Sequence, residues 1–325
     1  MTLAAAGPHA RSEPADRDRN VGTDLTASTD LTAGTDREAG AERLLTASVR
    51  HSYDPAIEVD WAAPHVPGTF WIRPERSSLF GTALWDGLSP AQQVELTKHE
   101  VANAACSGIW FETMLMRMLV REYASWDPRS KHAQYALTEI ADECRHSIMF
   151  GRLVESMGTP VYSPSRREAA LAKFLVATAR GAHMYASILI AEEILDALQR
   201  EIMVDETLQP LIRMVSRIHV VEEARHVRFA RDELVRQVAA SSPLALTHAR
   251  IIVGRSALVV SNRFTHPAMY ASVGIDPAAG RAAARANPYF RDTMRWAGSR
   301  VAAFLGEQGL IAGPAVALWK RASLI

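Results

Sequence analysis

Apolar and polar residues recur with helical spacing along most of the chain after Ser89, and capping residues divide this part into long helices. Strand signals are nearly absent. The pattern therefore predicts an all-α fold, a ferritin-like four-helix bundle with additional C-terminal helices and an extended N-terminal arm. The four long helices are expected to run from Ser89 to about Tyr123, from Ser130 to Met157, from Ser163 to about Val204, and from Glu206 to Ala240.

The two ends of the chain differ from this central part. The segment TDLTAS at residues 23–28 recurs as TDLTAG at residues 29–34, and such a repeat has too few large apolar side chains to offset the entropy of ordering. We predict that residues 1–45 are disordered and that residues 46–325 form one domain. Proline and aromatic residues are frequent in residues 51–89, as expected for the arm, and two or more further helices should fill residues 244–325, one beginning near Asn287.

The composition excludes several classes of protein. Of the 325 residues, 48% are apolar, which is enough to bury a substantial core. The 36 Lys and Arg balance the 36 Asp and Glu, and a chain without net charge is poorly suited to bind nucleic acid. Two cysteines are too few for a disulfide framework. No secretory signal and no apolar run of the ~18 residues needed to cross a membrane is visible, so we expect a cytoplasmic protein.

Two copies of one short motif carry the candidate chemistry. Glu143 and His146 lie in the segment DECRH, and Glu223 and His226 lie in the segment EEARH. Residues three apart share a face of a helix, so each Glu-x-x-His pair can bind one metal ion. A single copy is typical of a solvated helix face. Two copies with nearly the same spelling, on two of the long helices, favour a metal site.

The other two long helices each carry a glutamate within an apolar segment, Glu112 in GIWFETMLM and Glu192 in SILIAEEILDAL. Either could instead be a buried ion-pair partner. Together with the motifs they give the order Glu, Glu-x-x-His, Glu, Glu-x-x-His, which is the ligand order of a ferritin-like dinuclear carboxylate site. Four carboxylates match the charge of two divalent irons, and imidazole is a neutral ligand that suits iron.

The fourth helix also carries His219. At about 100° per residue, His219 lies on the same stripe as Glu223 and His226, whereas several arginines of this helix face the opposite side. A lone histidine on such a stripe is more often a core residue, but these neighbours favour a third nitrogen ligand.

Two acidic residues directly precede the motif glutamates. Asp142 and Glu222 can accept the second N–H of a ligand histidine on a facing helix, with Arg145 and Arg225 balancing their charge. Ordinary surface ion pairs are the alternative. Glu139, on the face of Glu143, is either an outer partner of the site or a salt-bridge residue.

From about Ser89 to Ala240 the sequence resembles the p-aminobenzoate N-oxygenase (AurF-type) family of non-haem diiron arylamine oxygenases. The motifs that carry the resemblance are FETMLM, IADECRH, LIAEEILDAL and HVVEEARH. The resemblance favours Glu192 over Glu193 and leaves Glu100 as the alternative to Glu112. His219 is the match that separates this family from related diiron enzymes. Position by position, the family's metal ligands fall on Glu112, Glu143, His146, Glu192, His219, Glu223 and His226.

The resemblance implies an enzyme with two iron ions per chain and dioxygen as co-substrate. It would oxidise the nitrogen of an amine, expected to be an aryl amine, through hydroxylamine and nitroso stages to nitro. No GxGxxG fingerprint of a flavin or nicotinamide site is present, so an external ferredoxin or reductase is expected to supply electrons. The resemblance also implies a homodimer.

Two other classes of function stay open at this point. One is a diiron desaturase or hydroxylase that acts on carbon, with a free or carrier-bound substrate. His219 argues against it. The other is a non-catalytic ferritin-like iron binder, against which the aromatic arm and the additional C-terminal helices argue.

Overall fold

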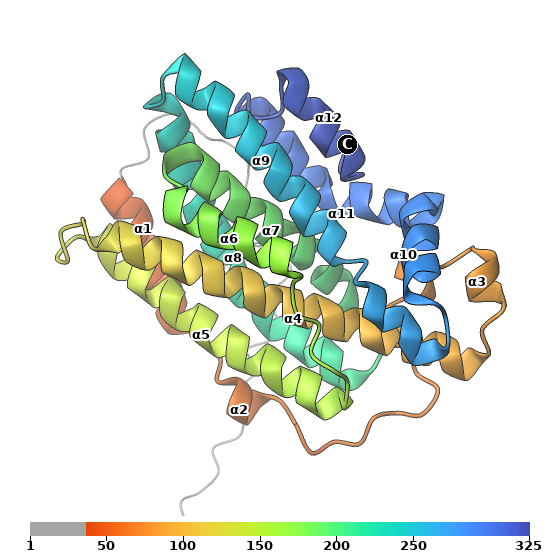
Figure 1. The fold of residues 1–325 in the computed structure, drawn as a ribbon. Coiled ribbons are helices and arrows are strands. Elements are labelled where there is room, and N and C mark those ends of the chain that lie inside the picture. Colours follow the sequence, from red (N-terminus) through yellow and green to blue (C-terminus); the bar gives the residue numbers. More distant parts are fainter. Residues whose placement is uncertain (1–36) are drawn as a thin grey trace, which may run out of the picture. The chain divides into compact units, whose positions relative to one another are not determined.

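Four long helices lie side by side and form a bundle (Figure 1). α4 packs along α5 and α7 packs along α8, while contacts of α4 with α7 and of α5 with α8 close the bundle. The computed structural model describes residues 37–325, and no strand occurs among them. The predicted all-α bundle is confirmed. Its helices are α4 (Pro90–Tyr123), α5 (Lys131–Met157), α7 (Gly181–Ile202) and α8 (Pro210–Ala239).

Capping residues set the ends of these helices close to the predicted positions. The Ser89 side chain accepts a hydrogen bond from Gln92 N at the start of α4, and the Ser130 side chain accepts one from Ala133 N at the start of α5. Gly158 ends α5 with a φ of 63°, in the left-handed region that glycine adopts at low cost.

The prediction of one continuous helix from Ser163 to Val204 is wrong. This segment forms two helices, α6 (Arg166–Thr178) and α7, separated at residues 179–180. Ser165 caps α6, forming a capping box with Glu168. The chain then turns at Gly181, whose φ of 55° is left-handed, so the backbone cannot continue the helix through this point.

The helix α1 (Arg37–Arg50) begins inside the segment that was predicted to be disordered. Contacts with other helices order it: the guanidinium of Arg37 pairs with Glu233 on α8 at 2.9 Å, and Glu38 accepts a hydrogen bond from Lys131 N at the start of α5. The prediction therefore fails for residues 37–45, because composition alone does not include these long-range contacts. Residues 1–36 lie outside the described residues.

The predicted arm at residues 51–89 contains only short helical segments and lies against α8. Tyr53 N donates a hydrogen bond to Glu222, and Gln209 N at the start of α8 donates one to the Phe70 carbonyl. Trp71 anchors the arm and is only 2% exposed. These segments are α2 (Pro55–Glu58), η3 (Pro74–Arg76) and α3 (Ala83–Asp86).

Additional C-terminal helices occur as predicted. α9 and α11 pack on α7, and α12 packs on α9. By length and composition alone, the segment Pro243–Val273 is apolar enough to cross a membrane, with 33% of its most apolar window buried. Such a segment is equally typical of a helix packed inside a protein. The elements are α9 (Pro243–Arg263), η4 (Pro267–Val273), α10 (Pro277–Ala286), α11 (Pro288–Glu307), η5 (Gly313–Ala315) and α12 (Val316–Arg321).

Apolar side chains of the bundle form two clusters, with a buried polar layer between them. Along α4, Leu96 to Cys106 belong to one cluster and Leu115 to Leu119 belong to the other. Glu112 lies between these two stretches and is 1% exposed. The same change of cluster occurs along α5 and α8 at their Glu-x-x-His motifs. The fold therefore places the motif residues at the middle of the bundle.

Candidate metal centre

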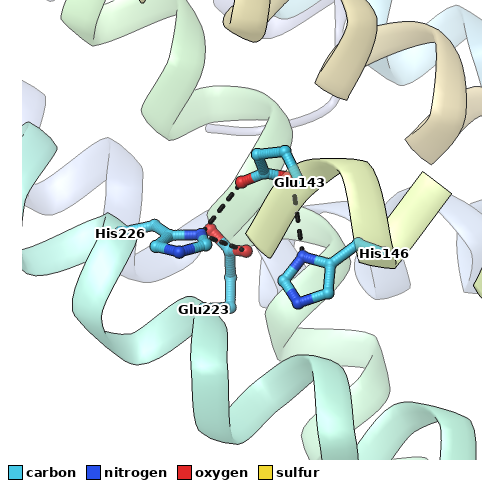
Figure 2. Close-up of side chains that lie close together, drawn as sticks. All are labelled: Glu143, His146, Glu223 and His226. Carbon is cyan, nitrogen blue, oxygen red and sulfur yellow. Dashed lines mark hydrogen bonds and ion pairs between the residues drawn. The ribbon is translucent and has the colours of Figure 1, made fainter. Parts of the chain in front are cut away.

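Seven buried side chains from four helices meet in this polar layer. They form three overlapping groups, in each of which one nitrogen or oxygen atom per residue lies within 4.8 Å of the others. The first group takes two residues from α5 and two from α8, whose side chains point toward one another in Figure 2. The groups are Glu143, His146, Glu223 and His226; Glu112, His146 and His219; and Glu192, His219 and Glu223.

Glu143 lies at the centre of the first group. Its Oε1 is 2.9 Å from Nδ1 of His226, and its Oε2 is 3.5 Å from Nδ1 of His146. Glu223 Oε2 is 3.2 Å from the same Nδ1 of His226. One carboxylate thus reaches toward both motif histidines, which is the position that a ligand bridging two metal ions requires.

His219 faces the same space from one turn earlier on α8. Its Nε2 is 3.7 Å from Glu112 Oε1 and also 3.7 Å from Glu223 Oε2. The ring of Phe150 covers His219, with the two ring centroids 5.0 Å apart. His219 therefore directs Nε2 inward, whereas the two motif histidines direct Nδ1 inward.

Many polar atoms of this cluster are buried and form no hydrogen bond with the described residues. Buried polar and charged groups of this kind are costly unless something compensates them. Carboxylate oxygens and imidazole nitrogens are ligands that suit first-row transition metals, iron among them. The residues present therefore fit a dinuclear metal site. The atoms are Glu112 Oε1, Glu143 Oε1 and Oε2, His146 Nδ1, both ring nitrogens of His219, and Glu223 Oε1.

The two motif histidines are oriented by carboxylates from the facing helix. His146 Nε2 lies 2.8 Å from Glu222 Oε2, and His226 Nε2 lies 3.2 Å from Asp142 Oδ2. Because a carboxylate only accepts, each Nε2 donates a proton outward, and Nδ1 is the ring nitrogen that faces the cluster. Asp142 in turn accepts hydrogen bonds from Arg145 and Arg225. The predicted contacts of Asp142 and Glu222 with a histidine of the facing helix are confirmed.

Burial and charge act differently on the groups of the cluster. Burial opposes ionisation of Glu143, but its contacts with His146 and His226 outweigh burial and hold its pKa well below the usual range. Burial likewise opposes the charged form of His146, yet Glu143 and Glu222 raise its pKa to about 10. Burial and then Glu143 raise the pKa of Glu112 to about 8. Burial and then His146 lower the pKa of His219 to about 4.

The alternatives to two predicted ligands lie elsewhere. Glu193 points away from the cluster and pairs with Arg231 on α8 at 2.9 and 2.5 Å, so Glu192 is the glutamate that turns inward. Glu100 accepts a hydrogen bond from Ser78 N at 2.7 Å and joins none of the three groups. Glu139 is buried without a hydrogen-bond partner for Oε2 and joins none of them either. Ligation of a metal by the seven clustered residues stays a prediction.

Sequence reasoning missed the surroundings of the cluster. Ser147 donates a hydrogen bond to Glu112 Oε2 at 2.5 Å, and no motif marks this serine. A narrow, mainly apolar cavity of about 70 Å³ is lined in part by Phe150 and Leu195, each within about one helical turn of a predicted ligand. Glu100 of α4 also lines it. Residues from α4, α5, α7, α8 and α11 line this cavity, so only the packed bundle reveals it.

The family model for P-aminobenzoate N-oxygenase AurF matches residues 34–309. The chain belongs to this family. The family prediction made from the motifs is thus confirmed, and the match extends beyond the bundle to most of the chain.

Two further comparisons are less informative for this AurF-family protein. It is 32% identical over 199 residues to uncharacterized protein Rv0885 of Mycobacterium tuberculosis and to uncharacterized protein Mb0909 of Mycobacterium bovis. The match covers 59% of this chain and 58% of each relative. A valine-to-isoleucine mutant of an R2-like ligand-binding oxidase with an aerobically reconstituted Mn/Fe cofactor aligns with a TM-score of 0.40 at 12% identity, covering 92% of this chain and 93% of the oxidase.

Proposed function

We propose that this protein is a non-haem diiron oxygenase that oxidises the nitrogen of an amine, expected to be an aryl amine. The observation that carries the proposal is the position of His219, whose Nε2 faces Glu112 and Glu223 inside the cluster. The third histidine is the feature by which the motifs match the AurF family, and membership of that family supports the same activity.

The first reaction takes an amine, dioxygen, two electrons and two protons to a hydroxylamine and water. One oxygen atom enters the new N–O bond and the other leaves as water. An external electron donor, a ferredoxin or a reductase, supplies the electrons. Two iron ions held by the cluster would bind dioxygen and accept these electrons. Each further stage, from hydroxylamine to nitroso and from nitroso to nitro, would consume another dioxygen with two electrons and two protons and release water.

The residues of the chain prepare the site for this reaction. Asp142 and Glu222 hold the two motif histidines in the orientation that leaves Nδ1 inward. Burial keeps His219 neutral at pH 7, with a pKa of about 4, so that its Nε2 is available as a ligand. Apolar side chains on both sides of the polar layer exclude water from the reacting groups.

The narrow cavity supports an apolar amine as substrate. Leu195, Phe150 and Ala105 contribute apolar walls, and Phe150 separates the cavity from His219.

A metal assay combined with product analysis tests the proposal. Protein reconstituted with ferrous iron, supplied with oxygen, a chemical reductant and a set of aryl amines, is expected to bind about two irons per chain. Mass spectrometry should detect hydroxylamine, nitroso or nitro products. Full iron binding without oxidation of any amine would refute the proposal, and products oxidised at carbon would favour a desaturase or hydroxylase.

The variant His219→Ala tests the role of the third histidine. We expect it to retain most of its iron, because the first group of four ligands is intact. Its N-oxidation rate should fall at least about tenfold, as is usual when a group at a metal site is lost. Iron content and activity both equal to those of the unchanged protein would remove the family-specific part of the proposal.

A further inference from the structure

A second cavity, of about 540 Å³, lies outside the bundle among the C-terminal elements. Side chains from α9, α10, α11, α12 and the residues after α12 line it. No acidic side chain is among the described residues that line it, and five of them are cationic, although the chain as a whole has no net charge. The five cations are Arg285, Arg291, Arg295, Lys320 and Arg321.

Most of this positive charge is not neutralised within the protein. Arg295 pairs with Asp292, which is itself exposed to solvent. Arg291 donates a hydrogen bond to the Arg285 carbonyl at 2.9 Å, which is a neutral acceptor. Among the described residues, no carboxylate lies within 4 Å of Lys320 or Arg321. Five like charges therefore line one cavity, and an anion bound among them would reduce their mutual repulsion.

The electrostatic surroundings of Arg285 support this picture. Burial and then the neighbouring charges of Arg281 and Arg321 lower its pKa. The Arg285 side chain also donates a hydrogen bond to the Asn262 side chain, which orients the guanidinium at the cavity wall. An arginine that is oriented without a carboxylate partner can offer its remaining N–H groups to an anion.

The basic cavity shares a wall with the narrow cavity. Phe290 and Met294 of α11 line both cavities. Both side chains are buried, at 8% and 1% exposure. These two side chains therefore lie between the basic cavity and the narrow cavity.

We propose that the basic cavity binds the diphosphate of a nucleotide-linked molecule such as coenzyme A. Five cations exceed what one carboxylate requires, whereas a diphosphate presents several anionic oxygens that arginines contact in pairs. Binding of the diphosphate does not rest on the proposed function.

Calorimetric titration of the full-length, iron-loaded protein with inorganic pyrophosphate at low ionic strength tests the site. We expect one pyrophosphate per chain, bound more tightly than orthophosphate, and binding of coenzyme A at the same site. In the variant Lys320→Gln with Arg321→Gln the Kd for pyrophosphate should rise at least about tenfold, since each charge-assisted hydrogen bond contributes roughly a factor of ten. Both side chains are exposed, so the fold should persist.

The matched control removes two exposed arginines of α6, Arg166→Gln with Arg167→Gln, and should change the Kd less than about twofold, because only distant, screened charges are lost. A second variant, Arg291→Gln, should weaken binding independently. The absence of pyrophosphate binding, or an equal loss in the control, would overturn the inference. The titration measures binding and not turnover, so the two proposals can fail separately. A protein that oxidises amines but does not bind pyrophosphate refutes only this inference. A protein that binds pyrophosphate but oxidises no amine refutes only the proposed function.

Discussion

The two halves of the bundle support their predicted ligands in different ways. In the half formed by α5 and α8, both motif histidines bond outward to a carboxylate of the facing helix, and the pKa of Glu143 is held below its usual range. In the half formed by α4 and α7, Glu112 has one hydrogen bond, from Ser147, and Glu192 has none with a described residue. Burial raises the pKa of both of these glutamates.

We call the half formed by α5 and α8 the braced half, because outer carboxylates hold its motif histidines, and the half formed by α4 and α7 the unbraced half. The braced half has its two motif histidines oriented before any metal binds, because a carboxylate of the facing helix holds each of them from outside. Glu112 and Glu192 have fewer contacts to hold them, so their carboxylates can change position at low cost. The narrow cavity opens between the helices that carry these two glutamates. The unbraced half is therefore the side from which we expect a substrate to approach.

Removal of a ligand from the braced half should have the largest effect. In Glu143→Ala both motif histidines lose the carboxylate between them, so metal affinity should fall by more than about 100-fold, with loss of oxygenase activity. Elemental analysis of reconstituted protein measures this. Glu155→Ala, at an exposed position on α5, is the control and should bind the full complement. Two metals per chain in Glu143→Ala would contradict the central role of this carboxylate.

The outer partners test the comparison directly. Glu222→Gln removes the anion behind His146 while preserving volume, and metal affinity should fall about 10- to 100-fold. Ser147→Ala removes the single support of Glu112 and should lower affinity about threefold or less, because one neutral hydroxyl contributes little. Competition with a metal chelator gives both values. Equal losses in the two variants would show that the halves are not supported differently.

Glu100 extends the comparison beyond the cluster, because it is another glutamate of α4 that is buried without a cationic partner. Burial raises its pKa from 4.5 to about 7. The folded state thus binds a proton that the unfolded state has released, so the free energy of unfolding should fall by roughly 3 kcal/mol as pH rises from about 4.5 to 7. In Glu100→Gln this contribution should vanish. Urea unfolding at pH 5 and pH 8 measures it, and an unchanged pH dependence in the variant would rule out Glu100 as its source.

The smallest effect concerns the glycine that makes room for Phe150. A Cβ at Gly108 on α4 would lie 3.1 Å from the Phe150 ring, whereas a Cβ at Gly151 on α5 meets nothing within 4 Å. Both substitutions to alanine gain helix propensity, but only Gly108→Ala must displace a ring packed on His219. We expect Gly108→Ala to be less stable than Gly151→Ala by about 1 kcal/mol. Thermal unfolding compares them, and equal stabilities would mean that Phe150 shifts freely.

Local features made much of the molecule predictable. Serine caps marked the starts of α4 and α5, with Pro90 beside the first of them, since these signals depend on a few adjacent residues. The break before α7 was missed because Gly181 carries no signal that distinguishes a tolerated helix glycine from a turn. α1 was missed because its stability comes from α5 and α8 rather than from its own sequence.

Helical spacing of three and four residues is a local property, and it grouped Glu143 with His146 and His219 with Glu223 and His226. Glu112 and Glu192 were marked only by their apolar segments and by the resemblance to the AurF-type family. The sequence could not decide between Glu192 and Glu193 on physical grounds. Arg231 of the neighbouring helix decides it by pairing with Glu193. Only the packing of the helices brings residues far apart along the chain into contact. The contacts of the outer carboxylates, the two cavities and the cluster of cations in the basic cavity all depend on such residues.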